Sequence, residues 1–130
     1  MATTTTPRRF GVKHAAQTFR AMADPTRLRL LHLLTRGERC VCELVDTVDQ
    51  PQPTVSRHLA YLRRAGLVAA RKDGLWVHYR LTEPHDELQR RLLDCIGCCF
   101  GDLSPFNRDM SRLAKCCRPG DQTTCAEPTR

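Results

Sequence analysis

Apolar residues in the first third of the chain recur every three or four positions, a spacing typical of amphipathic helices. The pattern predicts a helix over about 13–22, with Phe19 and Met22 facing inward. A second helix is expected to begin at Asp24-Pro25, because aspartate is a good helix cap and proline fits the first helical turn. This second helix carries a leucine at every third position from 28 to 34, so one side of it is expected to be buried.

Two further helices are predicted close together in the middle of the chain. A short one covers about 41–48, and the sequence DQPQP at 49–53 breaks it. The next begins near Pro53, and its apolar side is formed by Val55, Leu59, Leu62 and Leu67. Two short helices joined by a polar turn are typical of a helix-turn-helix.

The segment after these helices predicts a β-hairpin. The sequence LVAARKDGLWVHYRL at 67–81 is rich in strand-forming residues and contains Asp73-Gly74, a strong signal for a tight turn. A helix-turn-helix followed by a basic hairpin predicts a winged helix-turn-helix. The fold class is therefore mainly α with a β-hairpin (α+β).

Two more helices are expected beyond the hairpin. One covers about 84–100, with Leu88, Leu92 and Ile96 at a spacing of four. A last short helix is expected over about 104–115.

The charge of the chain points to an anionic partner. Its 130 residues include 21 Lys and Arg against 14 Asp and Glu, giving a net charge of +7. Double-stranded DNA is the expected partner, and a membrane is not, because the chain has no long apolar run. The N-terminus carries a basic pair without an apolar stretch behind it, so we expect a cytoplasmic protein.

The second helix of a helix-turn-helix enters the major groove, and its N-terminal residues reach the base edges. The residues expected to contact bases are Gln52, Thr54, Ser56, Arg57 and His58. Those expected to contact phosphates are Arg63, Arg64, Arg71 and Lys72. Any one of these side chains could equally be an ordinary solvated charge, so the prediction rests on the set.

Eight cysteines in a chain without a signal peptide favour a metal or redox role over a disulfide framework. They cluster at 40/42, 95/98/99 and 116/117/125. Cys40 and Cys42 stand at the expected start of the short helix, where the helix dipole lowers a thiol pKa. Side chains two positions apart diverge in a regular helix, so a shared ligand is expected to deform that turn.

Four stretches resemble the ArsR/SmtB-type family of metalloregulatory repressors. They are ADPTRLRLLHLL at 23–34, CVCELV at 40–45, QPTVSRHLAYLRRAGLV at 52–68 and DGLWVHYRL at 73–81. The resemblance implies a homodimeric transcriptional repressor that dimerises through its first and last helices. It also implies that the protein leaves its operator when a metal or metalloid binds.

With this resemblance the chain is expected to divide into three parts. A flexible N-terminal arm covers 1–11, and a winged helix-turn-helix domain for DNA binding and dimerisation covers 12–103. A short helix with a cysteine-containing flexible tail covers 104–130.

The arsenic(III)-responsive branch of the family has a motif similar to ELCVCDLC, which supplies three thiols from one short helix. Cys40 and Cys42 match its first two cysteines, but Val45 stands where the third would be. Arsenite or antimonite is the implied inducer, with no obligatory cofactor. The third ligand, or a second site, could come from Cys95, Cys98 and Cys99, which share one helical face. These three could instead be buried in a dimer core, and the role of Cys116, Cys117 and Cys125 stays open.

Three other functions compete with this hypothesis. An arsenate reductase of the phosphatase-like kind needs an arginine six positions after its cysteine, and no cysteine here has one, so we expect no enzyme. A thiol redox or persulfide switch could use the same fold, with a disulfide from Cys95 to Cys99 or to a cysteine of the tail. A cadmium, lead or zinc sensor is also compatible with thiol ligands.

Overall fold

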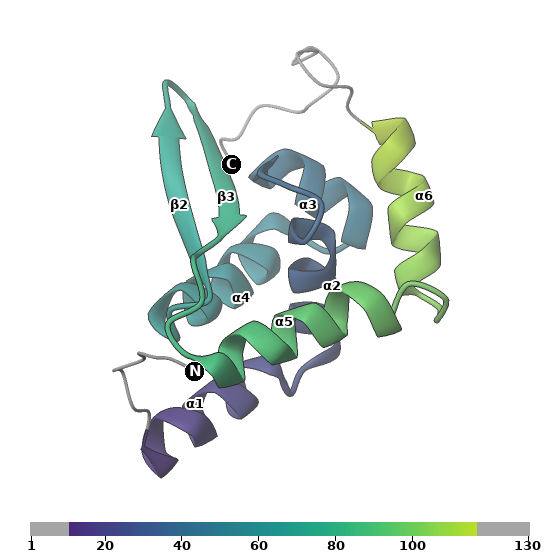
Figure 1. Cartoon of the computed structure of the whole chain (residues 1–130). Helices are drawn as coiled ribbons and strands as arrows, with labels where there is room; N and C mark the ends of the chain where they lie inside the picture. Colours follow the sequence, from purple (N-terminus) through teal and green to yellow (C-terminus); the bar gives the residue numbers. More distant parts are fainter. Residues whose placement is uncertain (1–10, 117–130) are drawn as a thin grey trace.

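The structure is a computed structural model that describes residues 11–116. Figure 1 shows helices gathered around a central one, with a hairpin that stands out from them. The elements, in chain order, are α1 (Val12–Met22), α2 (Pro25–Leu34), β1 (Arg39–Cys40), α3 (Val41–Val48), α4 (Gln52–Arg64), β2 (Val68–Asp73), β3 (Trp76–Leu81), α5 (Glu87–Cys99) and α6 (Phe106–Cys116). The expected winged helix-turn-helix is confirmed.

Helix α2 lies at the centre of the fold and packs against α1, α3, α4, α5 and α6. As predicted, Asp24 caps it by accepting a hydrogen bond from the backbone N–H of Arg27 at 3.0 Å, and Pro25 occupies its first turn. Leu30, Leu31 and Leu33 are fully buried. A helix surrounded on several sides buries more than one stripe, which explains why burial here is broader than the three-residue spacing suggests.

Helix α4 presents the predicted apolar side to the core. Val55, Leu59 and Leu62 are fully buried, and so is Leu67 just after the helix. Gly66 follows the helix with φ of 81°, a left-handed conformation that glycine adopts without strain. The chain therefore turns sharply from α4 into the hairpin.

The hairpin, called the wing from here on, consists of β2 and β3. Their antiparallel register runs from Val68 opposite Leu81 to Asp73 opposite Trp76. Two residues form the turn, Gly74 and Leu75, and Gly74 has a positive φ of 65°. The hairpin prediction is confirmed, with glycine as the first loop residue.

A strand that the sequence did not predict precedes α3. The two residues of β1 pair with β3, Arg39 opposite Tyr79 and Cys40 opposite His78, so the sheet order is β1-β3-β2. A strand of two residues is too short to show any periodicity. It forms only because the fold brings it beside β3.

Two expectations about the outer helices are wrong. Phe19 does not face inward, since 53% of its surface is exposed, whereas Met22 is buried as expected. Helix α5 begins at Glu87 rather than near 84, because Asp86 caps it by accepting from the backbone N–H of Gln89 at 2.9 Å. The buried residues of α5 are Gln89, Leu93 and Ile96, whereas Leu88 and Leu92 are only partly buried.

Helix α6 packs against α2 and α3. A bidentate ion pair fixes it there: Arg29 Nε and Nη2 each donate to the Asp109 carboxylate at 2.8 Å. Asp109 is fully buried. Arg29 Nη2 also donates to the carbonyl of Val48 at 3.3 Å, so the same guanidinium connects α2, α3 and α6.

Residues 1–10 of the predicted arm lie outside the described residues, as do Cys117 and Cys125 of the predicted tail. Within the described range, no helix combines the length and the apolar character needed to cross a membrane.

Candidate thiol site and nucleic-acid interface

Cys40 and Cys42 converge in the folded protein. Cys40 is the N-cap of α3 and has extended backbone angles, φ −71° and ψ 148°, while Cys42 lies in the first helical turn. The two Sγ atoms are 2.9 Å apart. The expectation that these side chains diverge is therefore wrong, because only one of the two residues is helical. A ligand that contacts both sulfurs needs no bend in the helix to reach them.

The Cys40 thiol also takes part in capping α3. Its Sγ accepts a hydrogen bond from the backbone N–H of Cys42 at 3.4 Å, and the Glu43 carboxylate accepts one from the backbone N–H of Cys40 at 2.9 Å. This reciprocal arrangement is that of a capping box, with a sulfur in place of the usual hydroxyl. The first turn of α3 therefore depends on a lone pair of the sulfur.

The pKa of Cys40 is lowered from 9.0 to about 6. The main cause is the hydrogen bond from the Cys42 thiol, and the backbone N–H of Cys42 and the imidazole of His78 act in the same direction. The direction agrees with the sequence-based expectation, although the principal cause is a neighbouring thiol rather than the helix dipole. Thiolate is the form that binds metals, so this cysteine is suited to be a ligand near neutral pH.

Both thiols are enclosed by the fold, Cys40 with 6% and Cys42 with 9% of its surface exposed. His78 lies opposite Cys40 on β3, and its Nε2 atom is buried with no hydrogen-bond partner among residues 11–116. Val45, at the position of the missing third cysteine, packs against the hydrophobic core. Among the described residues, no group of three potential ligands is already arranged to hold a metal ion.

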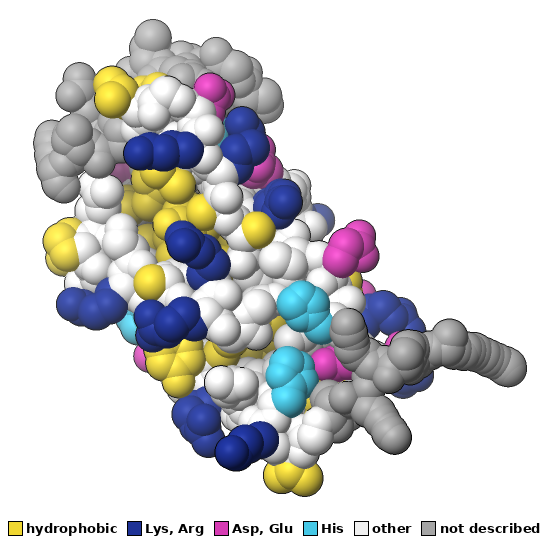
Figure 2. All heavy atoms as spheres, turned by 90° about the vertical axis from the view of Figure 1, so that its left-hand side faces the viewer, with side chains coloured by type: hydrophobic (Ala, Val, Ile, Leu, Met, Phe, Trp, Pro, Cys, Tyr) yellow, Lys and Arg dark blue, Asp and Glu magenta, His cyan; other side chains and the backbone are white. Residues whose placement is uncertain are grey.

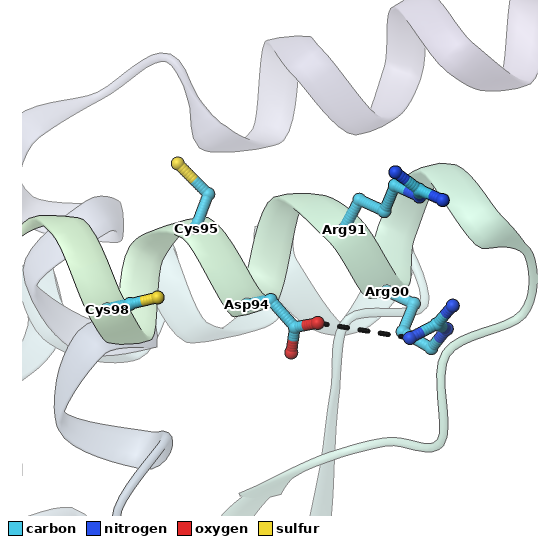
Figure 3. Close-up of a pocket in the computed structure, with 5 residues that line it drawn as sticks. All are labelled: Arg90, Arg91, Asp94, Cys95 and Cys98. Carbon is cyan, nitrogen blue, oxygen red and sulfur yellow. Dashed lines mark ion pairs between the residues drawn. The ribbon is translucent and has the colours of Figure 1, made fainter.

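The cysteines of α5 form a different environment. Cys95, Cys98 and Cys99 are all exposed, so they are not buried within the protomer. Cys95 and Cys98 line an open pocket of about 400 Å³ together with Arg90, Arg91 and Asp94. Figure 3 shows that the Cys95 and Cys98 thiols point in different directions, while Arg90 pairs with Asp94 at 3.9 Å. The helix therefore does not present a preformed three-thiol site.

The predicted base-contacting residues lie on the first two turns of α4. Arg57 is exposed, and Gln52, Thr54 and Ser56 are partly exposed. His58 is engaged within the protein: its Nδ1 lies 3.2 Å from Arg27 Nη1 and 3.8 Å from the Asp24 carboxylate. The structure thus brings this set together on one helix and ties the last of them to the start of α2.

The predicted phosphate-contacting residues are all exposed, Arg63 and Arg64 at the end of α4 and Arg71 and Lys72 on the wing. Figure 2 shows Lys and Arg side chains recurring along one face of the molecule between apolar ones. Arg71 is held by Glu38, to which Nη2 and Nε donate at 2.8 and 3.1 Å. This bridge links the wing to the residue just before β1.

Sequence reasoning missed Glu38, Glu43 and His78. Glu43 had a detectable signal, because it stands three positions after Cys40 as in a capping box. Glu38 and His78 carry no such local signal. Only the β1–β3 pairing brings Glu38 to Arg71 on the wing and His78 to Cys40.

Comparison with known proteins places the chain in a family. Residues 24–70 match the model of the family described as bacterial regulatory protein, arsR family. The arsenical resistance operon repressor of Escherichia coli (strain K12) is 56% identical over 70 residues, which are 53% of this chain and 59% of that protein. The match therefore spans less than two thirds of that relative.

Two further matches cover more of their own chains. An uncharacterized HTH-type transcriptional regulator of Methanocaldococcus jannaschii is 44% identical over 81 residues, 62% of this chain and 91% of that protein. The structure of a homodimeric winged helix-turn-helix DNA-binding domain from Mycobacterium bovis, a possible ArsR-family regulator, superposes with a TM-score of 0.57 at 32% identity, covering 65% of this chain and 76% of that one. These relatives are regulators of transcription, not enzymes. The chain is a member of the arsR family of bacterial regulatory proteins.

Proposed function

We propose that this protein is a homodimeric transcriptional repressor that binds double-stranded operator DNA and releases it when arsenite or antimonite binds Cys40 and Cys42. The observation that carries the proposal is the 2.9 Å separation of the two sulfurs at the junction of β1 and α3. Vicinal thiolates suit a thiophilic trivalent ion. The similarity to an arsenical resistance operon repressor supports the same inducer.

DNA binding is proposed to follow the helix-turn-helix pattern. The first turns of α4 enter the major groove, where Gln52 and Arg57 offer bidentate geometry to adenine and guanine. Thr54 and Ser56 contact bases or phosphates beside them. The arginines at the end of α4 and the basic residues of the wing contact phosphates, which adds affinity and salt dependence.

A homodimer is proposed because the outer side of α1 carries apolar side chains that no other described residue of the protomer covers. Val12 is 87% exposed and Phe19 53%. Exposed apolar side chains of this size on one helix favour an interface. The structurally similar domain from Mycobacterium bovis is homodimeric. Two copies of α4 would then reach two half-sites of an operator.

The switch is proposed to act at the α3 cap. An ion bound to Cys40 Sγ draws electron density from the sulfur and weakens the hydrogen bond that it accepts from the Cys42 N–H, so the cap on the first turn of α3 is weakened. Because α3 packs against α4 and β1 pairs with β3, a change at the cap alters the positions of both DNA-contacting elements, α4 and the wing. A typical coupling free energy lowers DNA affinity roughly 5- to 150-fold. The third donor to a trivalent ion is proposed to be an α5 thiol of the second protomer or a hydroxide.

The experiment is a DNA-binding titration under full reduction. A DNA fragment selected from a random pool by the protein is labelled, and anisotropy is measured with and without arsenite. Cys40→Ser and Cys42→Ser should bind the DNA as the wild type does and keep it when arsenite is added, and Cys95→Ser in the same titration tests whether an α5 thiol is the third donor. If both site variants release the DNA like the wild type, the assigned inducer site is wrong.

The exposure of Cys95, Cys98 and Cys99 favours a thiol redox switch as a second candidate function. Cys95 and Cys99 lie one helical turn apart. Peroxide would take two electrons and two protons from two thiols, forming a disulfide and water. DNA release by peroxide without metalloid, lost in Cys95→Ser and kept in Cys40→Ser, would support this function over the first.

A further inference from the structure

We propose that Cys40, Cys42 and His78 together bind a borderline divalent cation of the Zn²⁺ class, with two sulfurs and one imidazole nitrogen as protein ligands. The inference rests on the proposed function, because the same two thiols receive the trivalent ion. It adds a ligand on the wing and so gives the competing divalent-metal function a specific set of donors.

The β1–β3 register places the imidazole beside the thiols. Cys40 lies directly opposite His78 in an antiparallel pair. Residues directly opposite each other project to the same face of the sheet, with Cβ atoms roughly 4.5–5.5 Å apart. The neighbouring pair, Arg39 and Tyr79, fixes this register. The ring therefore stands on the side of the sheet where the sulfur of Cys40 emerges.

The free nitrogen of His78 is the second observation. Its Nε2 atom is buried and has no hydrogen-bond partner in the part of the chain that the structure describes, although a buried polar atom ordinarily has one. Imidazole nitrogen is a common ligand for zinc, copper and nickel. A cation on the thiol side of the sheet would satisfy this atom.

Charge balance favours a divalent cation at this combination of donors. Two thiolates and a neutral imidazole carry a charge of −2, so a divalent ion makes the enclosed site neutral. A trivalent ion with the same donors leaves one positive charge in a buried place, which is costly. A trivalent metalloid therefore needs a third anionic donor, and His78 is dispensable for it.

The donors must adjust when the ion arrives, since no three potential ligands are prearranged at binding distance among the described residues. Zinc–sulfur bonds of about 2.3 Å in a tetrahedron separate two sulfurs by about 3.8 Å. The two sulfurs, now 2.9 Å apart, would spread, and the His78 ring would rotate toward them. A water molecule would fill the fourth position, and the ion would link the start of α3 to the wing.

The test uses the reduced full-length protein with its histidine rings labelled with ¹⁵N. One equivalent of Zn²⁺ should move the Nε2 resonance of His78 to the range of a metal-bound nitrogen. Competition with a chelator should show that His78→Gln lowers the Zn²⁺ affinity roughly 100-fold, because even indirect metal partners contribute 10- to 100-fold. The same substitution should change the arsenite affinity by less than about threefold relative to the wild type, which is well below the tenfold change that corresponds to one pKa unit.

Two controls separate the possible failures. His85→Gln removes an exposed histidine and should bind both ions as the wild type does. His78→Cys supplies a third thiol, so it should raise the arsenite affinity and confirm that the position reaches the ion. This inference is wrong if Zn²⁺ leaves the His78 resonance of the wild type unchanged and the His78→Gln variant binds Zn²⁺ normally. That result leaves the proposed function standing. Normal arsenite binding in both Cys40→Ser and Cys42→Ser overturns the proposed function as well.

Discussion

Cys40 lies directly opposite His78 across the β1–β3 ladder and is at the same time the N-cap of α3. One residue therefore belongs both to the sheet of the wing and to the helix that supports α4. Any ligand of its sulfur acts on both elements without an intermediate.

The pKa of Cys40 should depend on the hydrogen-bond donor at position 42. Cys42→Ala removes the main cause of the lowering, so the pKa of Cys40 should rise from about 6 toward 9.0. Cys42→Ser keeps a hydroxyl donor and should retain much of the lowering. The ¹³Cβ chemical shift of Cys40, followed against pH, measures this pKa directly. Equal midpoints in Cys42→Ala and the wild type would contradict the assignment.

The same pKa makes the free energy of unfolding depend on pH. An acid whose pKa is lower in the folded state stabilises the fold fully above its unfolded pKa. For Cys40 the contribution should be complete above pH 9, decrease as the pH falls from 9 to 6, and vanish below 6. Urea titrations at several pH values should show this trend in the wild type and its loss in Cys40→Ser.

Arg71 should become more available to DNA when Glu38 is neutralised. The Glu38–Arg71 pair is exposed and therefore weak, so Glu38→Gln should raise DNA affinity by no more than about fivefold. The slope of log affinity against log salt should steepen by about one. Anisotropy titrations at several salt concentrations measure both quantities. Glu87→Gln, on an arginine-paired carboxylate of α5, is the matched control.

The buried pair between α2 and α6 should be important for stability. Asp109→Ala leaves the Arg29 guanidinium without its carboxylate, and breaking a buried pair costs about 3–5 kcal/mol. Urea denaturation followed by circular dichroism measures the loss. Arg112→Ala removes a longer contact to exposed Asp49, at 3.9 Å, and should cost less than about 1 kcal/mol. Similar losses in both variants would show that burial of the pair is unimportant.

Phe19 should contribute to dimerisation. Burial of a phenylalanine contributes about 1.5–3 kcal/mol, so Phe19→Glu should weaken the dimer roughly tenfold or more. Sedimentation velocity over a range of protein concentrations measures the dissociation constant. Leu75→Glu, at an even more exposed apolar position on the tip of the wing, should leave the dimer unchanged. A dimer unaffected by Phe19→Glu would place the interface elsewhere.

The sequence by itself determined the helices and the hairpin, because their signals are local. Asp24-Pro25 specified the start of α2, the spacing of Val55, Leu59 and Leu62 specified the buried side of α4, and Asp73-Gly74 specified the wing. Caps, periodicity and turn residues act within a few positions, so they can be read along the chain.

Only the tertiary structure decided how the thiols are arranged. The convergence of Cys40 with Cys42 and its place opposite His78 depend on β1, which exists because β3 lies beside it. The burial of Asp109 against Arg29 likewise joins residues 80 positions apart. Contacts between distant segments leave no periodic trace in a sequence, since they arise only when the core brings those segments together.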